Sequence, residues 1–109
     1  MKIIKRDGTK VPFNKDKIIN AINKAFIDVD GKLYESDTAA DIASEIENKI
    51  NNSTTVEMIQ NWIEDYLMRS ERKDVARAYI RYRYKKEVAR NYTNDFIDAI
   101  KEKLTAANV

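Results

Sequence analysis

The first eighteen residues place a hairpin turn directly before a helix start, and this order constrains the fold more than any other feature. Asp7-Gly8 lies between two β-prone segments, residues 2–6 and 10–13, and Gly8 can supply the positive φ that a tight hairpin turn needs. Asn14 follows as a candidate N-cap, and apolar residues then recur at helical spacing. An isolated hairpin is marginally stable in water, so we expect it to pack on helices.

Helices joined by short polar breaks account for the rest of the chain. With 2 Gly, 1 Pro and 43% hydrophobic residues, the composition is typical of a compact, helix-rich domain. Ser, Asp, Thr and Asn at the breaks are the usual helix caps. The predicted elements are a helix over 15–27, a loop over 29–36, a second helix capped by Ser36 or Asp37 and ended by 51–53, a third helix capped by Thr54 or Thr55, a break at 70–73, a fourth helix over about 74–90, a break at 91–93 and a last helix capped by Thr93.

The predicted fold class is α+β, mostly α. We expect a four-to-five-helix bundle capped by a small N-terminal β-hairpin, or by a three-stranded sheet if residues 53–55 add an edge strand. At 109 residues the chain has the length of one domain. We expect residues 1–90 to form it, with residues 91–109 as a C-terminal helix, linker or interaction element.

Charge is distributed unevenly, although the net charge is only +2. Residues 1–26 carry a net charge of +5, residues 27–71 of −8, and residues 72–90 of +6. If the fold brings the two basic segments together, they create a local positive field.

Three basic residues beside the hairpin are candidate phosphate ligands. Lys5 and Arg6 precede the turn, and Lys17 lies in the first turn of the predicted helix over 15–27. Lysine supplies a compact charge, arginine a planar fork of donors, and a helix N-terminus itself favours anions. This combination indicates an anion pocket and suggests a nucleotide. The alternative is that these are ordinary solvated surface charges.

Basic and aromatic residues alternate between Tyr79 and Lys86. On a helix, Tyr79, Tyr82, Arg83 and Lys86 share one face. Such a face can stack on bases and pair with phosphate, so a nucleic-acid-binding helical module is an alternative function. A core helix with its tyrosine hydroxyls at the rim is the other alternative. The small net charge argues against nucleic acid as a partner.

Several function classes are excluded by composition. The chain has no Cys and no His, which removes thiol nucleophiles, disulfides and the commonest general base and metal ligand. Two glycines, Gly8 and Gly31, cannot build a Walker A or G-x-G-x-x-G loop. We therefore expect neither catalysis nor a metal site. No apolar run approaches the roughly 20 residues that span a bilayer, so we expect no membrane partner and a cytoplasmic location.

Three stretches, in order, resemble the ATP-cone domain, the nucleotide-sensing regulatory domain of many ribonucleotide reductases and of the repressor of reductase genes. The resemblance covers about residues 2–88, and its Tyr-x-x-Tyr-Arg variant is most similar to the anaerobic reductases. The stretches are Ile4-Lys5-Arg6-Asp7-Gly8 with Pro12-Phe13-Asn14 and Lys17-Ile18, then residues 56–64, and then residues 74–83 with the pattern VA-x-x-Y-x-x-Y-R.

The resemblance implies a non-catalytic domain that binds ATP or dATP, with or without Mg²⁺, and so controls a ribonucleoside-triphosphate reductase and deoxyribonucleotide biosynthesis. The implied partners are the reductase catalytic domain or another cone domain. The chain has neither the long catalytic domain of the reductases nor the Cys-rich ribbon of the repressor, so we expect a sensor without its effector. The implied nucleotide-binding residues are Ile3, Lys5, Arg6, Asn14, Lys17, Ile18, Ile22, Ile59, Tyr79, Arg83 and Lys86.

Overall fold

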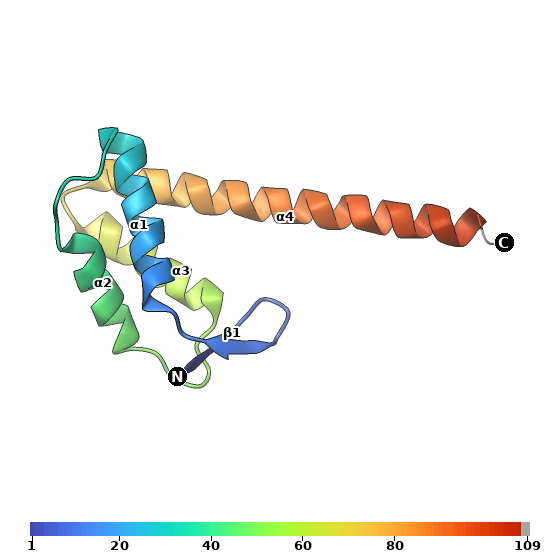
Figure 1. Ribbon diagram of the computed structural model, residues 1–109, viewed down its shortest axis with the longest axis horizontal. Coiled ribbons are helices and arrows are strands. Elements are labelled where there is room, and N and C mark those ends of the chain that lie inside the picture. Colours follow the sequence, from blue (N-terminus) through green and yellow to red (C-terminus); the bar gives the residue numbers. More distant parts are fainter. Residues whose placement is uncertain (108–109) are drawn as a thin grey trace.

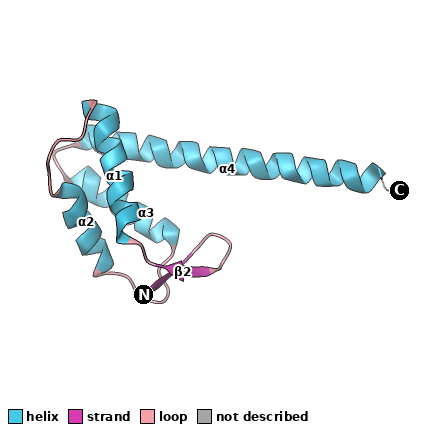
Figure 2. Cartoon of the chain, in the orientation of Figure 1, coloured by secondary structure: helices cyan, strands magenta, loops and turns pink. Residues whose placement is uncertain are grey.

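A computed structural model of the chain, which describes residues 1–107 and the side chains of residues 1–103, has a mostly helical α+β fold (Figure 1). The predicted fold class is confirmed. Figure 2 shows the small sheet at one end of the helices. The elements are β1 (Lys2–Ile4), β2 (Lys10–Pro12), α1 (Lys15–Asp30), α2 (Thr38–Glu47), α3 (Val56–Arg69) and α4 (Lys73–Ala107).

The hairpin forms as its turn residues predict. β1 and β2 are antiparallel, with Ile3 opposite Val11. Gly8 has a φ of 87°, the left-handed conformation that glycine adopts without a steric cost. The Asp7 carboxylate accepts hydrogen bonds from the Thr9 N–H at 3.0 Å and the Thr9 hydroxyl at 2.6 Å, which fixes the turn.

The alternative of a third strand over residues 53–55 is wrong. Within the described residues the sheet has two strands, and the segment contributes one isolated parallel bridge between Ile4 and Thr55. The Ile4 N–H donates to the Thr54 carbonyl at 2.9 Å. Because α3 begins at Val56, the backbone turns into a helix before a second bridge can form.

Two predicted N-caps are confirmed. The Asn14 side chain accepts from the Asp16 N–H at 3.0 Å, and the Thr55 hydroxyl accepts from the Met58 N–H at 3.1 Å. α1 runs three residues beyond the predicted end, because the left-handed residue that can terminate it is Gly31, with a φ of 79°. α2 ends at Glu47, earlier than the predicted stop at 51–53.

The core is built from aliphatic residues of all four described helices. Ile22 of α1, Ile46 of α2, Leu67 of α3 and Val75 of α4 are each fully buried. Burying one such side chain contributes about 1.5–3 kcal/mol. α1 packs against α2 and α4, and α3 packs against α4. The core therefore fixes how close α1 and α4 lie to each other.

An ion pair joins α1 and α4 at one end. Arg72, just before α4, donates to both carboxylate oxygens of Asp30, the last residue of α1, at 2.6 and 3.2 Å. This two-pronged geometry is the strong form of an arginine–carboxylate contact. It ties the C-terminal end of α1 to the start of α4.

The predicted break at 91–93 is wrong, because α4 continues through it to Ala107 (Figure 1). Residues 73–107 contain neither Gly nor Pro, and Asn or Thr in a helix costs only a few tenths of a kcal/mol. The Thr93 hydroxyl does not cap a new helix but donates to the Ala89 carbonyl at 2.9 Å. The last capped helix over residues 93 onward is therefore the outer part of α4.

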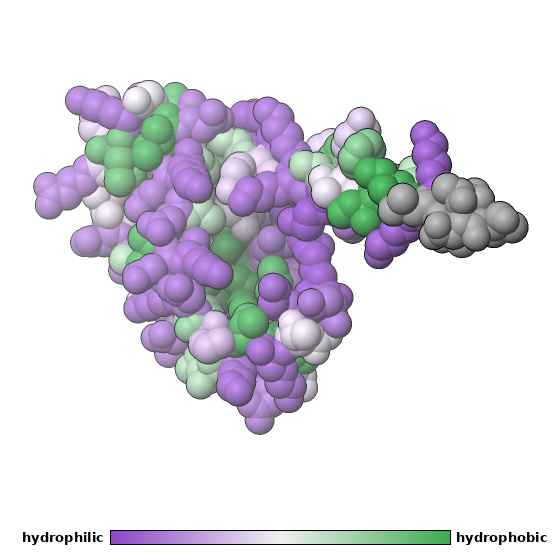
Figure 3. Space-filling view, turned by 45° about the vertical axis from the view of Figure 1, so that its right-hand side comes forward, coloured by the Kyte–Doolittle hydropathy of each residue, from purple (hydrophilic) through white to green (hydrophobic). Residues whose placement is uncertain are grey.

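The outer half of α4 projects from the body. The radius of gyration is 17.4 Å, whereas a compact chain of this length has about 13 Å. Its apolar side chains, including Phe96, Ile97 and Ile100, are exposed. Figure 3 shows hydrophobic surface on the projecting segment. Within the described residues, no helix combines the length and the apolar character that crossing a bilayer requires.

Leu67 and Met68 offer a matched test of how the core of the four helices is packed. Leu67 is fully buried, and its neighbour Met68 is 44% exposed. We expect Leu67→Ala to lower the free energy of unfolding by about 2–5 kcal/mol, because it leaves a cavity among the four helices. Met68→Ala should change it by less than about 0.5 kcal/mol. Urea unfolding followed by circular dichroism measures both, and equal losses would contradict the assigned core.

Candidate functional site

A cavity of about 1040 Å³ lies between the hairpin, α1 as far as Lys24, the start of α3 and the middle of α4. This volume is at the upper end of the range for small-molecule sites, about 300–1,000 Å³. Figure 3 shows hydrophobic side chains recessed in the body and surrounded by hydrophilic ones. The cavity is therefore large enough for a nucleotide-sized ligand.

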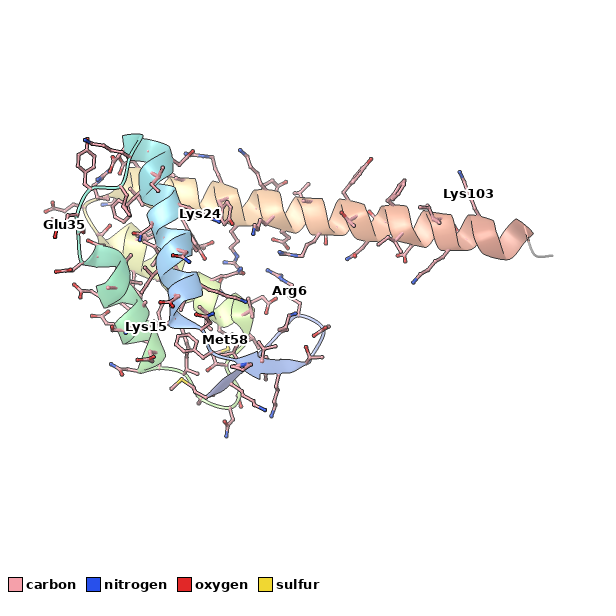
Figure 4. All side chains as sticks on the ribbon, viewed as in Figure 1. Arg6, Lys15, Lys24, Glu35, Met58 and Lys103 are labelled. Atoms are coloured by element: carbon pink, nitrogen blue, oxygen red, sulfur yellow. The ribbon has the colours of Figure 1, made fainter. Side chains whose placement is uncertain are left out.

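The cavity is strongly cationic. In the part of the chain that the structure describes, seven basic side chains line it, against Asp16 as the one carboxylate. Figure 4 shows Lys24 on α1 and Arg6 on the hairpin turn, with the Arg6 side chain extending toward α4. The two basic segments of the sequence thus meet in space, which concentrates positive potential. The basic residues of the lining are Lys5 from the hairpin, Lys15, Lys17 and Lys24 from α1, and Arg83, Lys86 and Arg90 from α4.

One part of the wall is apolar. Ile3 and Val11 contribute from the two strands, Ile18 from α1 and Ile59 from α3. Ile18 and Ile59 also belong to the buried core, so this wall of the cavity is continuous with the core. A cavity with a cationic side and an apolar side suits a ligand that has both an anionic and a flat, weakly polar part.

Arg83, which lines the cavity, and Arg6, which lies beside it, are both held by α3. Arg83 Nη1 donates to Asn61 Oδ1 at 2.7 Å and to Glu64 Oε1 at 3.0 Å. Arg6, from the hairpin turn, contacts the beginning of the same helix. Its Nη1 lies 3.0 Å from a Glu57 carboxylate oxygen, and its Nη2 donates to Gln60 Oε1 at 3.2 Å.

Tyr82 lies between two lysines of the cavity. The Lys86 ammonium is 5.1 Å and the Lys24 ammonium 5.9 Å from the centroid of its ring, within cation–π range. A hydrogen bond with Lys86 is the largest of the effects that lower the pKa of the Tyr82 hydroxyl. Tyr82 therefore connects α1 and α4 across the cationic side.

Residues 1–88 match the family model of the ATP cone domain, which is most of the chain. This chain belongs to the ATP-cone family. It is 33% identical over 109 residues to an anaerobic ribonucleoside-triphosphate reductase of Haemophilus influenzae, covering 98% of this chain and 15% of the reductase.

Other relatives of this cone come from different protein classes. A vitamin B12-dependent ribonucleoside-diphosphate reductase of Thermoplasma acidophilum is 41% identical over 95 residues, covering 81% of this chain and 12% of the reductase. The transcriptional repressor NrdR of Prochlorococcus marinus is 28% identical over 80 residues, covering 73% of this chain and 48% of the repressor. The cone thus spans a small fraction of each reductase that it resembles.

Most of the nucleotide-binding residues predicted for the cone lie together. Arg6 does not line the cavity, but it contacts Gln60, which does. Ile22 is fully buried in the core and contributes no surface to the cavity. The nine predicted residues in the lining are Ile3, Lys5, Asn14, Lys17, Ile18, Ile59, Tyr79, Arg83 and Lys86.

The prediction missed several residues of the lining, including Asn20, Lys24 and Arg90. Helical spacing could have found them. Asn20 and Lys24 are three and seven residues beyond Lys17, and Arg90 is seven beyond Arg83, so each shares a face with a predicted residue.

Burial raises the pKa of the Tyr79 hydroxyl above its ordinary value of about 10, because the phenolate loses its hydration. The unfolded cone releases this proton at a lower pH than the folded cone does. The contribution of Tyr79 to stability is therefore complete below pH 10 and is lost as the pH rises above it.

We expect Tyr79→Phe to make the cone less sensitive to alkaline pH. Between pH 9 and pH 11 the free energy of unfolding should fall more steeply for the wild type, by up to about 1.4 kcal/mol per unit above pH 10. Urea unfolding across this pH range measures the difference. Tyr82→Phe is the control, since the pKa of Tyr82 is lowered and its removal should not flatten the profile. Equal slopes for the wild type and Tyr79→Phe would contradict the burial argument.

Proposed function

We propose that the cavity binds ATP or dATP as a regulatory ligand and that its occupancy controls the activity of a ribonucleotide reductase. The observation that carries this proposal is the cationic cavity itself, with basic side chains from the hairpin, α1 and α4 on one side and an apolar wall on the other. Membership of the ATP-cone family supports an adenine nucleotide over other anions.

The triphosphate is proposed to lie against the cationic side. Lys5 and Lys17 approach from the hairpin and the start of α1, while Arg83 and Lys86 approach from α4. The backbone N–H groups at the N-terminus of α1, beside the Asn14 cap, add further donors and the positive end of the helix dipole. Charge-assisted hydrogen bonds of this kind provide most of the binding free energy in this proposal.

The adenine ring is proposed to lie against the apolar wall of Ile3, Ile18 and Ile59. Gln60, at the same cavity, carries both a hydrogen-bond donor and an acceptor on its amide, which suits the polar edge of a purine. The ribose then lies between the wall and the cations.

We propose that the nucleotide is bound and not turned over. The chain has no His, and Asp16 is the one carboxylate of the cavity within the described residues, so no pair of acid–base groups faces the ligand. A Mg²⁺ site built from protein groups needs several oxygen ligands, and this lining offers one carboxylate among the described residues. In this proposal any Mg²⁺ is therefore carried by the triphosphate itself.

The partner in this proposal is a reductase catalytic domain or another cone. The relatives include reductase chains of two types, each several times longer than this cone. A nucleotide that changes such a contact acts through a coupling free energy between the two sites, typically 1–3 kcal/mol.

Lys17→Ala tests the phosphate side. We expect the Kd for ATP to rise about tenfold or more, because a charge-assisted contact contributes roughly 1.5–3 kcal/mol. Isothermal titration calorimetry measures the Kd. Lys103→Ala is the matched control, since Lys103 lies on the projecting part of α4, far from the cavity (Figure 4), and should leave the Kd unchanged. Undetectable binding of ATP and dATP by the wild type at millimolar concentration would refute the proposed function.

The two nucleotides should bind this chain with similar affinity. ATP and dATP differ by one hydroxyl, and one neutral hydrogen bond contributes about 1 kcal/mol. Their Kd values, measured by the same titration, should therefore differ by no more than about fivefold. A hundredfold difference between the two Kd values would show that the cavity distinguishes the riboses through more than one contact.

Salt dependence separates this proposal from the nucleic-acid alternative. A nucleic-acid-binding helix would bind DNA or RNA with an affinity that falls steeply with salt, and free ATP would not compete. We expect ATP to displace any weakly bound oligonucleotide from the cavity, as measured by fluorescence anisotropy at several salt concentrations.

A further inference from the structure

We propose that Glu57 and Glu64 of α3 are exchangeable counter-ions, which Arg6 and Arg83 leave for phosphate oxygens when a nucleotide binds. The inference rests on the proposed function and deepens it. It assigns the control of nucleotide affinity to two carboxylates that do not themselves line the cavity.

The Arg83 contact shows the competition most directly. Arg83 lines the cavity, yet its Nη1 is used by Glu64 Oε1 at 3.0 Å and by Asn61 Oδ1 at 2.7 Å. Both partners lie on α3, away from the ligand space. A guanidinium is a rigid plane and both bonds to α3 use the same nitrogen, so turning Nη1 toward a phosphate breaks at least one of them.

Arg6 repeats the arrangement at the other end of the same helix. It bonds to Glu57 at 3.0 Å and to Gln60 at 3.2 Å, and Gln60 is itself part of the lining. Hence both arginines flank the cavity while their charges are compensated by α3.

The spacing of the α3 residues explains why one helix can do this. Glu57, Gln60, Asn61 and Glu64 follow at intervals of three, one and three residues, so all four share a face. That face contacts Arg6 of the hairpin turn and Arg83 of α4, and the adjoining side of α3 carries Ile63 and Leu67 into the core. The acceptors are therefore held rigidly while the arginine side chains can swing.

Exposure favours the exchange. The Arg83–Glu64 side chains are 18% and 25% exposed, and the Arg6–Glu57 side chains are 35% and 38% exposed. Water can reach both carboxylates after the arginines leave, so neither becomes a buried, unpaired charge. A triphosphate carries more negative charge than one carboxylate and attracts the guanidinium more strongly.

Glu64→Gln tests the exchange. It keeps the size and one acceptor of the side chain but removes the competing charge. We expect ATP to bind about two- to fivefold more tightly than to the wild type, the range expected for a partly exposed ion pair. Inorganic triphosphate, titrated alone, should show the same gain, since the exchange involves phosphate and not adenine. Isothermal titration calorimetry measures both ligands.

Two further variants define the origin of the effect. Glu87→Gln removes one negative charge from α4, one turn beyond Arg83, where Glu87 is exposed and is not a partner of that arginine. It should leave the Kd nearly unchanged. Glu64→Asp keeps the charge on a shorter side chain and should bind ATP with an affinity closer to that of the wild type. Circular dichroism confirms that each variant is folded.

The outcomes separate the two proposals. If the wild type binds neither ATP nor dATP, the proposed function and this inference both fail. If the wild type binds but Glu64→Gln does not bind more tightly, only the exchange is refuted. Weaker binding by Glu64→Gln would show that Glu64 positions Arg83 for the phosphate, and an equal gain for Glu87→Gln would show a general field effect. Either result overturns the exchange.

Discussion

Packing of buried aliphatic side chains holds groups of like charge close together in this fold. Ile22 and Val75 anchor α1 and α4 in one core, so the lysines of α1 face the basic side chains of α4. These cations repel one another, and water and salt reduce that repulsion only in part. The hydrophobic core offsets the remaining cost. A site that attracts polyanions can therefore persist in a chain whose net charge is small.

α3 contributes to the core with one side and binds the two arginines with another, because helical spacing separates its apolar residues from its carboxylates. Apolar residues at Ile59, Ile63 and Leu67 enter the core, while the carboxylates at Glu57 and Glu64 contact the arginines of the hairpin turn and of α4. Because α3 is anchored in the core by its apolar residues, its carboxylates hold the two arginines at fixed positions relative to the core. The acidic middle of the sequence thus supplies counter-charges as well as a solvated surface.

Local chemistry was predictable from the sequence, and long-range geometry was less so. The hairpin turn at Gly8 and the caps at Asn14 and Thr55 depend on neighbouring residues alone, and they form as predicted. The cavity lining followed mainly from the family resemblance, because spacing cannot show which helix faces which. The break at 91–93 was wrongly predicted, since polar residues were taken as a stop although their helix penalty is small.

Because α4 is one continuous helix, a small tilt near the cavity displaces its far end by a larger distance. The helix begins in the core, passes the cavity at Lys86 and continues as one rod to Lys103 and beyond. At a rise of 1.5 Å per residue, the segment between these two lysines is about 26 Å long. A tilt of about 5° at the cavity would carry its far end through about 2 Å. Small adjustments around a ligand are thereby magnified with distance, without any change in the helix itself.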